Sequence, residues 1–171
     1  MKHQDLLDVL NDLLTDYLYD IAVFTNLTQD HLDYHLTMEN YYDAKKKLFT
    51  EHCKTAIINI DDDYGIRLWN DIENAGCERI SYGLHAGAEV KADKIRSSGA
   101  STKFWISVNS KSFPVTLNMI GEYNVSNALA AIVACLKSGV GINDAILSLG
   151  KCKGVKGRCE ILTSERGFLV V

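Results

Sequence analysis

The sequence has a single proline among 171 residues, no cysteine pair at metal-binding spacing and no apolar run of membrane-spanning length. A membrane-spanning helix needs about 20 mostly apolar residues, so the sequence predicts no such helix. An odd number of cysteines without a Cys-x-x-Cys motif indicates neither a disulfide framework nor a structural zinc site. We therefore expect a cytoplasmic protein whose thiols are reduced and mostly buried. They belong to Cys53, Cys77, Cys135, Cys152 and Cys159.

Blocks of like charge are also absent. Eighteen Lys and Arg residues stand against 22 Asp and Glu residues, which gives a formal net charge of −4. A surface for nucleic acid or for an anionic membrane needs clustered basic residues, so we expect neither partner. The composition, 47% hydrophobic and 23% charged, instead fits a globular chain long enough to bury a core. The expected partners are small molecules or proteins.

The common glycine-rich phosphate loops are missing as well. Neither Gly-x-x-x-x-Gly-Lys-Ser/Thr nor Gly-x-Gly-x-x-Gly occurs, and residues 150–152 lack both the earlier glycine and the hydroxyl of the first motif. The residues alone therefore make no case for a complete ATP site.

The first third of the chain has the pattern of a parallel α/β unit. Apolar residues at helical spacing predict an amphipathic helix over 5–18. The short apolar runs 21–24 and 56–60 predict strands covered on both faces, and a helix is predicted between them over 37–51. Both runs end in polar loops, which would open on the sheet edge where α/β proteins hold ligands.

The middle of the chain is rich in β-forming residues and turns. Four segments predict a small antiparallel β annex: 79–84, 90–97, 102–108 and 113–119. Two helices and two strand-like segments follow, at 124–136, 143–149, 160–162 and 168–171. The predicted fold class is α/β, with a mostly parallel central sheet flanked by helices and an antiparallel annex.

One lysine falls on the apolar stripe of the helix predicted over 37–51. Lys45 lies on this stripe, whereas Lys46 and Lys47 are expected to face solvent. An ammonium among apolar groups loses hydration, which favours the neutral amine, and a neutral amine can act as a nucleophile or take up carbon dioxide as a carbamate. The alternative is a lysine whose stem packs on the stripe and whose head reaches water. The stripe consists of Met38, Tyr41, Tyr42, Leu48 and Phe49.

Two imidazoles and two carboxylates fall within residues 30–35, a set that can coordinate a divalent cation. His31 and His35 have the i, i+4 spacing of a zinc hydrolase helix, but Leu32 stands where the general-base glutamate is needed. A solvated surface turn is the alternative interpretation.

Two amides and one arginine complete the candidate residues. Asn124 and Asn127 lie three residues apart at a predicted helix start, where such amides are most often caps. Arg158 follows the glycine-flanked turn 154–157, which could meet a phosphate but is more often a solvated loop.

Several separated strings resemble the central domain of the Mur ligases, the ATP-dependent enzymes that build the peptidoglycan stem peptide. The likeness is greatest to the MurE branch, which extends UDP-MurNAc-L-Ala-D-Glu. It runs from about Asp20 to Val171 and implies a sheet of the P-loop type that lacks its P-loop. The strings occur in the family's order: TNLTQDHLDYH at 25–35, MENY at 38–41, AK at 44–45, LF at 48–49 and VKADKI at 90–95.

The resemblance implies roles for five residues. Lys45, carbamylated, and His31 would hold a magnesium ion between the nucleotide γ-phosphate and the acceptor carboxylate. Asn124 and Asn127 would hold the adenine, and Arg158 would reach the nucleotide. In the family's reaction the D-glutamate carboxylate attacks ATP to give an acyl phosphate, which the amine of L-lysine or meso-diaminopimelate then attacks. Magnesium and basic groups offset the accumulating negative charge.

The same resemblance implies a partial protein. Residues 1–19 are expected to form an amphipathic helix outside the match, 20–160 a partial central domain, and 161–171 the start of the C-terminal ligase domain. We expect half of an ATP site, half of a metal site and no activity from the chain alone. Two alternatives stay open. One is a non-catalytic interaction module that self-associates or pairs with a complementing polypeptide as half of a split ligase. The other is a metal-dependent hydrolase.

Overall fold

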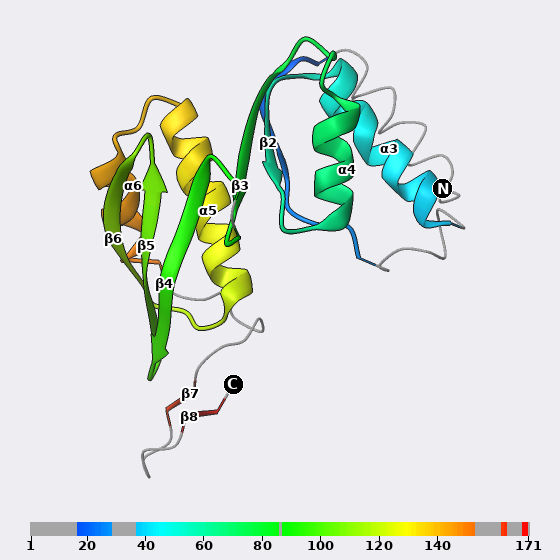
Figure 1. Ribbon diagram of the computed structural model, residues 1–171. Helices are drawn as coiled ribbons and strands as arrows, with labels where there is room; N and C mark the ends of the chain where they lie inside the picture. The colour runs from blue at the N-terminus through cyan, green and yellow to red at the C-terminus, as the bar shows by residue number, and fades with distance from the viewer. Residues whose placement is uncertain (1–16, 29–36, 86, 153–161, 164–168, 171) are drawn as a thin grey trace. The chain divides into compact units, whose positions relative to one another are not determined.

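The computed structural model describes residues 17–28, 37–85, 87–152, 162–163 and 169–170. Its six-stranded sheet has the order β1-β2-β3-β4-β5-β6, and β7 and β8 form a separate antiparallel pair (Figure 1). The predicted α/β class, with parallel and antiparallel parts, is confirmed. The elements are β1 (Tyr19–Phe24), α3 (Met38–Glu51), β2 (Cys53–Asn59), α4 (Asp63–Asp71), β3 (Glu78–Gly83), β4 (Val90–Ser98), β5 (Ser101–Val108), β6 (Lys111–Leu117), α5 (Glu122–Lys137), α6 (Ile142–Leu149), β7 (Leu162–Thr163) and β8 (Leu169–Val170).

The chain divides into two compact units, 1–81 and 82–171. In the first, β1 and β2 pair in parallel, with Ala22 opposite Ala56 and Phe24 opposite Ile58. Helices α3 and α4 pack against β2 (Figure 1). The expectation that both strands are covered on both faces is right for β2 but wrong for β1. Burial alternates along β1: Ala22 and Phe24 are buried, whereas Val23 is 37% exposed, so one face of this edge strand is open.

The helix predicted over 37–51 is confirmed. Thr37 is its N-cap and accepts a hydrogen bond from the Asn40 amide at 3.1 Å, as hydroxyl caps do. The amphipathic helix predicted over 5–18 lies outside the described residues except for its last two. Tyr17 and Leu18 are exposed and non-helical, and β1 begins directly after them.

In the second unit, β4, β5 and β6 form an antiparallel meander, which confirms the annex. The segment predicted over 79–84 was wrongly included in it, because β3 pairs with β4 in parallel. A parallel connection normally needs a dozen or more residues. This one is shorter because only two residue pairs overlap, Tyr82 with Val90 and Gly83 with Lys91.

A β-bulge interrupts the segment VKADKI. The pairing of β4 with β5 shifts between Asp93 and Arg96, and Lys94 adopts a positive φ of 53° there. One extra residue on one strand bends that strand and redirects its side chains. Helices α5 and α6 pack against this meander and each other, and α5 buries Val125, Leu129 and Ile132 completely.

The tight turn between β5 and β6 offers a stability prediction. Its two central residues, Asn109 and Ser110, have φ values of 49° and 62°. A turn with positive φ at both positions favours Asn-Gly, because glycine adopts this conformation without a steric penalty. We expect Ser110→Gly to raise the free energy of unfolding by about 0.5–1 kcal/mol. Urea unfolding measures it, and Lys111→Gly, one residue into β6, should lower that free energy instead.

Candidate functional site

The carboxyl ends of β1 and β2 lie at the same edge of the sheet, where the polar loops were expected to open. Asn59, at the end of β2, is the residue that joins the loops. Its amide Nδ2 donates to the carbonyl oxygen of Thr25 at 2.8 Å, and its Oδ1 accepts from the amide of Asp61 at 3.0 Å. The prediction that the two loops meet at this edge is confirmed.

Helix α4 begins at the same edge. Its N-cap Asp62 accepts from the Gly65 amide at 3.0 Å and from the Leu27 and Tyr64 amides, so it connects both loops to the helix start. Burial raises the pKa of Asp62, against these hydrogen bonds, which act to lower it. Asp62 therefore serves the local structure, as caps do, rather than standing free as a ligand.

Lys45 projects from α3 towards the end of β1. Its Nζ lies 4.8 Å from the ring centroid of Tyr41 and 6.0 Å from that of Phe24, which is 3% exposed. Lys45 itself is half-buried, and no hydrogen bond or ion pair joins Nζ to another described residue. The prediction that Lys45 lies among the apolar groups of α3 is confirmed: Tyr42 and Phe49 are buried, and Met38, Tyr41 and Leu48 pack against the same core.

Lys46 lies partly in solvent, as predicted, with 31% of its side chain exposed, but it is also paired. Its Nζ forms an ion pair with Asp71 of α4 at 2.7 Å, and the buried Tyr42 hydroxyl donates to the same carboxylate at 2.8 Å. Lys47 is exposed, as expected. The sequence did not predict the ion pair, because helical spacing cannot show that α4 brings a carboxylate beside Lys46.

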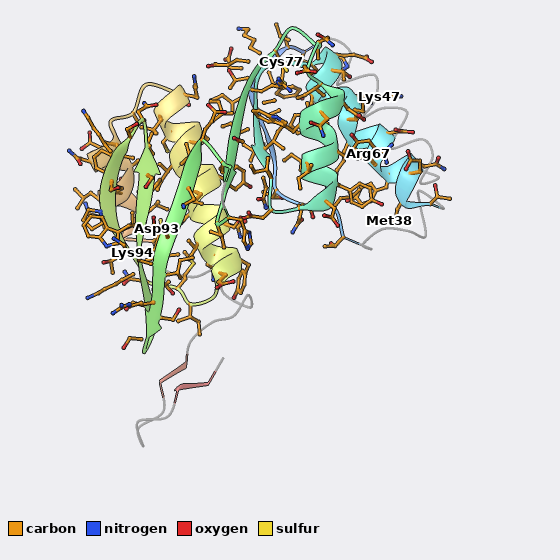
Figure 2. All side chains as sticks on the ribbon, in the orientation of Figure 1. Met38, Lys47, Arg67, Cys77, Asp93 and Lys94 are labelled. Carbon is orange, nitrogen blue, oxygen red and sulfur yellow. The ribbon has the colours of Figure 1, made fainter. Side chains whose placement is uncertain are left out.

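A second contact holds α4 to α3. Arg67, which Figure 2 labels on α4, donates two hydrogen bonds to the Glu39 carboxylate, and its Cζ lies 4.1 Å from the Tyr42 ring centroid. Arg67 lowers the pKa of Glu39, and Glu39 in turn raises the pKa of Arg67. Burial and the hydrogen bond to Asp71 raise the pKa of Tyr42 above its ordinary value. These contacts fix the helix that carries Lys45.

The Asp71 contacts predict acid sensitivity. The hydrogen bond from Lys46 lowers the pKa of Asp71, and the Tyr42 hydroxyl adds to this. A lowered folded pKa contributes stability that is present above the unfolded value, about 3.9, and is lost as pH falls through the folded value. We expect Asp71→Asn to cost about 1–2 kcal/mol at neutral pH. The loss should shrink as pH falls below about 3.9, because the carboxylate is protonated there in the unfolded chain and, at still lower pH, in the folded chain as well. Urea unfolding across pH measures both, and Asp43→Asn, exposed on α3, should change neither.

Asn124 and Asn127 lie in the first two turns of α5. Neither is the N-cap, which corrects that interpretation: the cap is Gly121, whose φ of 97° suits glycine. Asn124 is half-buried, and its Nδ2 donates to the carbonyl oxygen of Ile120 at 2.7 Å. Asn127 is exposed and makes no hydrogen bond to another described residue. Three residues apart on a helix, the two amides share one side of α5.

The remaining predicted residues, His31, His35 and Arg158, lie outside the described residues. Within the described part of the chain, no group of three or more His, Cys, Asp or Glu side chains is arranged for a metal ion. None of the described helices is both long and apolar enough to cross a membrane.

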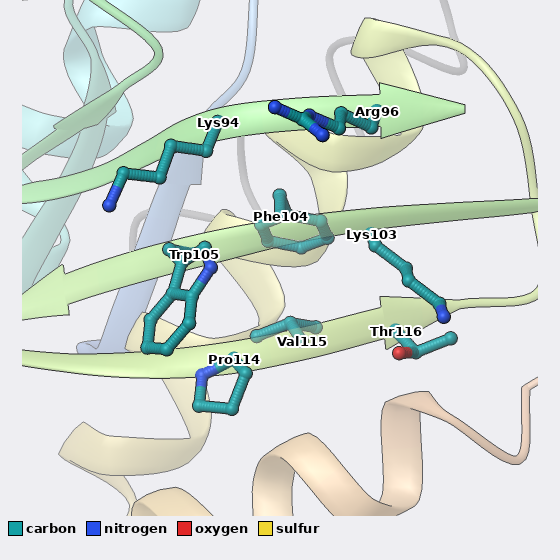
Figure 3. A pocket seen from close by; sticks show the side chains of 8 residues that line it. All are labelled: Lys94, Arg96, Lys103, Phe104, Trp105, Pro114, Val115 and Thr116. Carbon is teal, nitrogen blue, oxygen red and sulfur yellow. The ribbon is translucent and has the colours of Figure 1, made fainter. Parts of the chain in front are cut away.

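The second unit has a cavity of about 300 Å³ on the meander. Lys94, displaced by the bulge, has its Nζ 5.6 Å from the ring centroid of the 40% exposed Trp105. Figure 3 shows this pair beside Pro114. None of the predicted site residues lines the cavity. Its lining is Lys94, Arg96, Lys103, Phe104, Trp105, Pro114, Val115 and Thr116.

Residues 3–135 match the family model of the Mur ligase middle domain. The chain belongs to the Mur ligase family. It is 43% identical over 152 residues to UDP-N-acetylmuramoyl-L-alanyl-D-glutamate--2,6-diaminopimelate ligase 1 of Clostridium acetobutylicum, covering 89% of this chain and 31% of that ligase. It is 34% identical over 165 residues to a UDP-N-acetylmuramyl-tripeptide synthetase of Roseiflexus, covering 90% of this chain and 32% of the synthetase. The chain thus spans about a third of the length of its curated Mur ligase relatives.

Solved Mur ligase structures share the fold. One structure of a UDP-N-acetylmuramoyl-L-alanyl-D-glutamate--2,6-diaminopimelate ligase has a TM-score of 0.77 at 31% identity, covering 85% of this chain and 31% of that one. A MurF structure from Acinetobacter baumannii has a TM-score of 0.74 at 26% identity, covering 85% of this chain and 32% of the MurF chain. The predicted resemblance to the central domain of this family is confirmed.

Sequence reasoning missed three residues that shape the edge of the first unit. Phe24 supplies a ring beside Lys45, Asn59 joins the two loops, and Asp62 caps α4. Asn59 had a signal, since it is a polar residue inside the apolar run 56–60. A polar side chain within a buried strand needs a hydrogen-bond partner. Such a residue is therefore a candidate for connecting neighbouring segments of the chain.

Proposed function

We propose that this chain is the central-domain part of an ATP-dependent ligase that acts in the cytoplasm on UDP-MurNAc-L-Ala-D-Glu. The amino acid added would be of the L-lysine or meso-diaminopimelate class, and diaminopimelate is named in the similar Clostridium ligase. One observation carries the proposal. Lys45 lies between aromatic rings at the end of β1, with no anionic partner among the described residues.

Magnesium fits Lys45 only if the amine is carboxylated. An ammonium repels a cation, whereas a carbamate presents anionic oxygens, the donor type that Mg²⁺ takes. A lysine already paired with a carboxylate, as Lys46 is with Asp71, would be held as an ammonium. We propose that the Lys45 carbamate and His31 hold Mg²⁺. Bound there, the ion would neutralise phosphate charge during acyl phosphate formation.

The amides of α5 suit the nucleotide base. An amide both donates and accepts hydrogen bonds, which matches the donor and acceptor groups on the adenine edge. Asn124 already binds the Ile120 carbonyl and so holds the start of α5, while Asn127 has its amide exposed. We propose that both hold adenine and that Arg158 contacts the nucleotide.

A chimeric enzyme tests the proposed function. In it, this chain replaces the matching segment of the Clostridium acetobutylicum diaminopimelate ligase, to which it is 43% identical. We expect formation of the UDP-MurNAc-tripeptide that depends on ATP, Mg²⁺ and diaminopimelate, measured by chromatography of the product. A chimera that melts cooperatively but makes no product would contradict the proposal.

The isolated chain should behave differently. Without a phosphate loop we expect it to show no sub-millimolar binding of a non-hydrolysable ATP analogue with Mg²⁺ in isothermal titration. Saturable binding in that range would show that the residues of this chain suffice to bind the nucleotide, and that this prediction is wrong.

A further inference from the structure

Two thiols of the first unit meet at one carbonyl oxygen. Cys53 Sγ and Cys77 Sγ lie 3.7 Å and 3.5 Å from the carbonyl oxygen of Phe49. Cys53 begins β2 and Cys77 directly precedes β3, where Figure 2 labels it. Two residues beyond Cys53, the Thr55 hydroxyl donates to the carboxylate of Glu78 at 3.3 Å, so the two segments run side by side here. The cysteines are therefore neighbours across two adjacent segments.

The Phe49 carbonyl accounts for the closeness of the two thiols. It belongs to the last turn of α3, where helix carbonyls lack intrahelical donors. Both S–H groups donate to it, and the two thiols also lie within hydrogen-bonding reach of each other. Both cysteines are free in the structure. The arrangement therefore holds the reduced pair in place without needing a bound ligand.

We propose that Cys53 and Cys77 form a dithiol site that low-molecular-weight disulfides of the glutathione type oxidise to an intramolecular disulfide. Neighbouring segments bring Cα atoms into the range that a disulfide spans. A metal ion is the poorer occupant, since the described residues supply no cluster of three ligands here. Among the described cysteines, neither Cys135 nor Cys152 forms a hydrogen bond with another thiol.

Disulfide formation takes two steps, attack on the small disulfide and then closure of the internal disulfide, and the exposure of each thiol indicates which cysteine acts first. Cys53 is 7% exposed, whereas Cys77 is half-buried and can be reached by a small disulfide. Burial, with Cys77 nearby, raises the pKa of Cys53 to about 12, so this thiol stays protonated in the first step. Cys77 is thus the attacking residue and Cys53 the resolving residue.

The exchange balances without another oxidant. The Cys77 thiolate attacks one sulfur of glutathione disulfide, which forms a mixed disulfide and releases a glutathione thiolate that takes up the displaced proton. Cys53 then loses its proton to solvent and attacks the Cys77 sulfur, which releases the second glutathione thiolate; that thiolate is protonated in turn. Two protein thiols and one small disulfide become one protein disulfide and two small thiols.

The site lies close to the helix that carries Lys45. The Phe49 ring meets the Phe24 ring edge-on, with centroids 6.0 Å apart, and Lys45 Nζ lies 6.0 Å from the Phe24 centroid. Oxidation removes both S–H donors of the Phe49 carbonyl, which lies in the last turn of α3. The dithiol itself, however, depends on no part of the proposed ligase function.

The test equilibrates a Cys135→Ser, Cys152→Ser, Cys159→Ser variant of the chain with glutathione redox buffers and quantifies each species by mass spectrometry. We expect a Cys53–Cys77 disulfide whose equilibrium constant is at least roughly tenfold larger in the native chain than in denaturant, because the fold raises the effective concentration of the two thiols. Peptide mapping of the unsubstituted chain should recover the same linked peptides, which guards against misfolding of the variant.

Single substitutions separate the two roles. Adding Cys53→Ser should trap a mixed disulfide on Cys77, whereas adding Cys77→Ser should leave the buried Cys53 reduced. Equal equilibrium constants in the native and denatured chain, or a product carrying two glutathiones in place of the internal disulfide, would overturn the proposal.

Discussion

Gly65→Ala is expected to lower the free energy of unfolding by about 3 kcal/mol or more. A Cβ on Gly65 would overlap the Asn59 carbonyl oxygen, well inside the van der Waals contact distance of the two atoms. This neighbour is backbone at the end of β2, so no side-chain rotation relieves the overlap. Helix α4 would have to move away from the edge where Asn59 and Asp62 join the loops.

Thermal unfolding measures the effect, and Gly150→Ala is the matched control. Gly150 has a φ of −63°, and an added Cβ would meet atoms no nearer than 3.5 Å, an ordinary contact. Alanine at a compatible position restricts the unfolded chain and stabilises by about 0.4–1 kcal/mol. We expect the midpoint to fall by about 6–12 °C for Gly65→Ala. It should stay level or rise for Gly150→Ala. Similar small shifts for both would show that β2 and α4 adapt to the methyl group.

The close contact at Gly65 illustrates what the sequence could not predict. The helix predicted over 37–51 and the strand predicted over 56–60 follow from local patterns of apolar residues. The helix formed within one residue of its expected bounds, whereas the strand β2 begins three residues earlier, at Cys53. How closely α4 approaches Asn59 depends on the packing of elements against each other, which no local pattern contains. The same reason explains the error at β3, since the β-forming residues of 79–84 do not reveal whether the partner strand runs parallel.

The candidate site was also predictable only in part: its local features could be predicted from the sequence, but the contacts made by the fold could not. Lys45 was found from helical spacing, because a cation on an apolar stripe is a local contradiction visible in the sequence. The partners that set its surroundings were not, because Phe24 lies 21 positions earlier and meets Lys45 only through the fold. The thiols show the same limit. Only Cys53 is buried as expected, whereas Cys77 and Cys135 are half-buried, Cys152 is exposed and Cys159 lies outside the described residues.

Lys45→Ala is expected to lower the rate of the chimeric ligase by about a hundredfold or more, since it removes a group assigned to hold the charge-neutralising ion. The fold should survive, because Lys45 is half-buried and makes no hydrogen bond or ion pair with another described residue. Lys45→Arg should be as damaging, although it retains the positive charge and most of the stem, because a guanidinium does not form a carbamate. Product formation at saturating ATP and diaminopimelate measures both rates.

Three comparisons separate a carbamate from a structural role. Lys47→Ala, exposed on the same helix, should leave the rate unchanged, and so identifies any general damage to α3. Small carboxylates such as acetate should restore part of the rate of Lys45→Ala, since they return anionic oxygens to the vacated space, but should not restore Lys45→Arg, whose side chain fills it. In ¹³C-bicarbonate, the unsubstituted chimera should show a carbamate carbon signal by NMR that Lys45→Arg lacks. Full activity of Lys45→Arg would mean that the amine is used as a cation, and the metal-holding assignment of Lys45 would then fail.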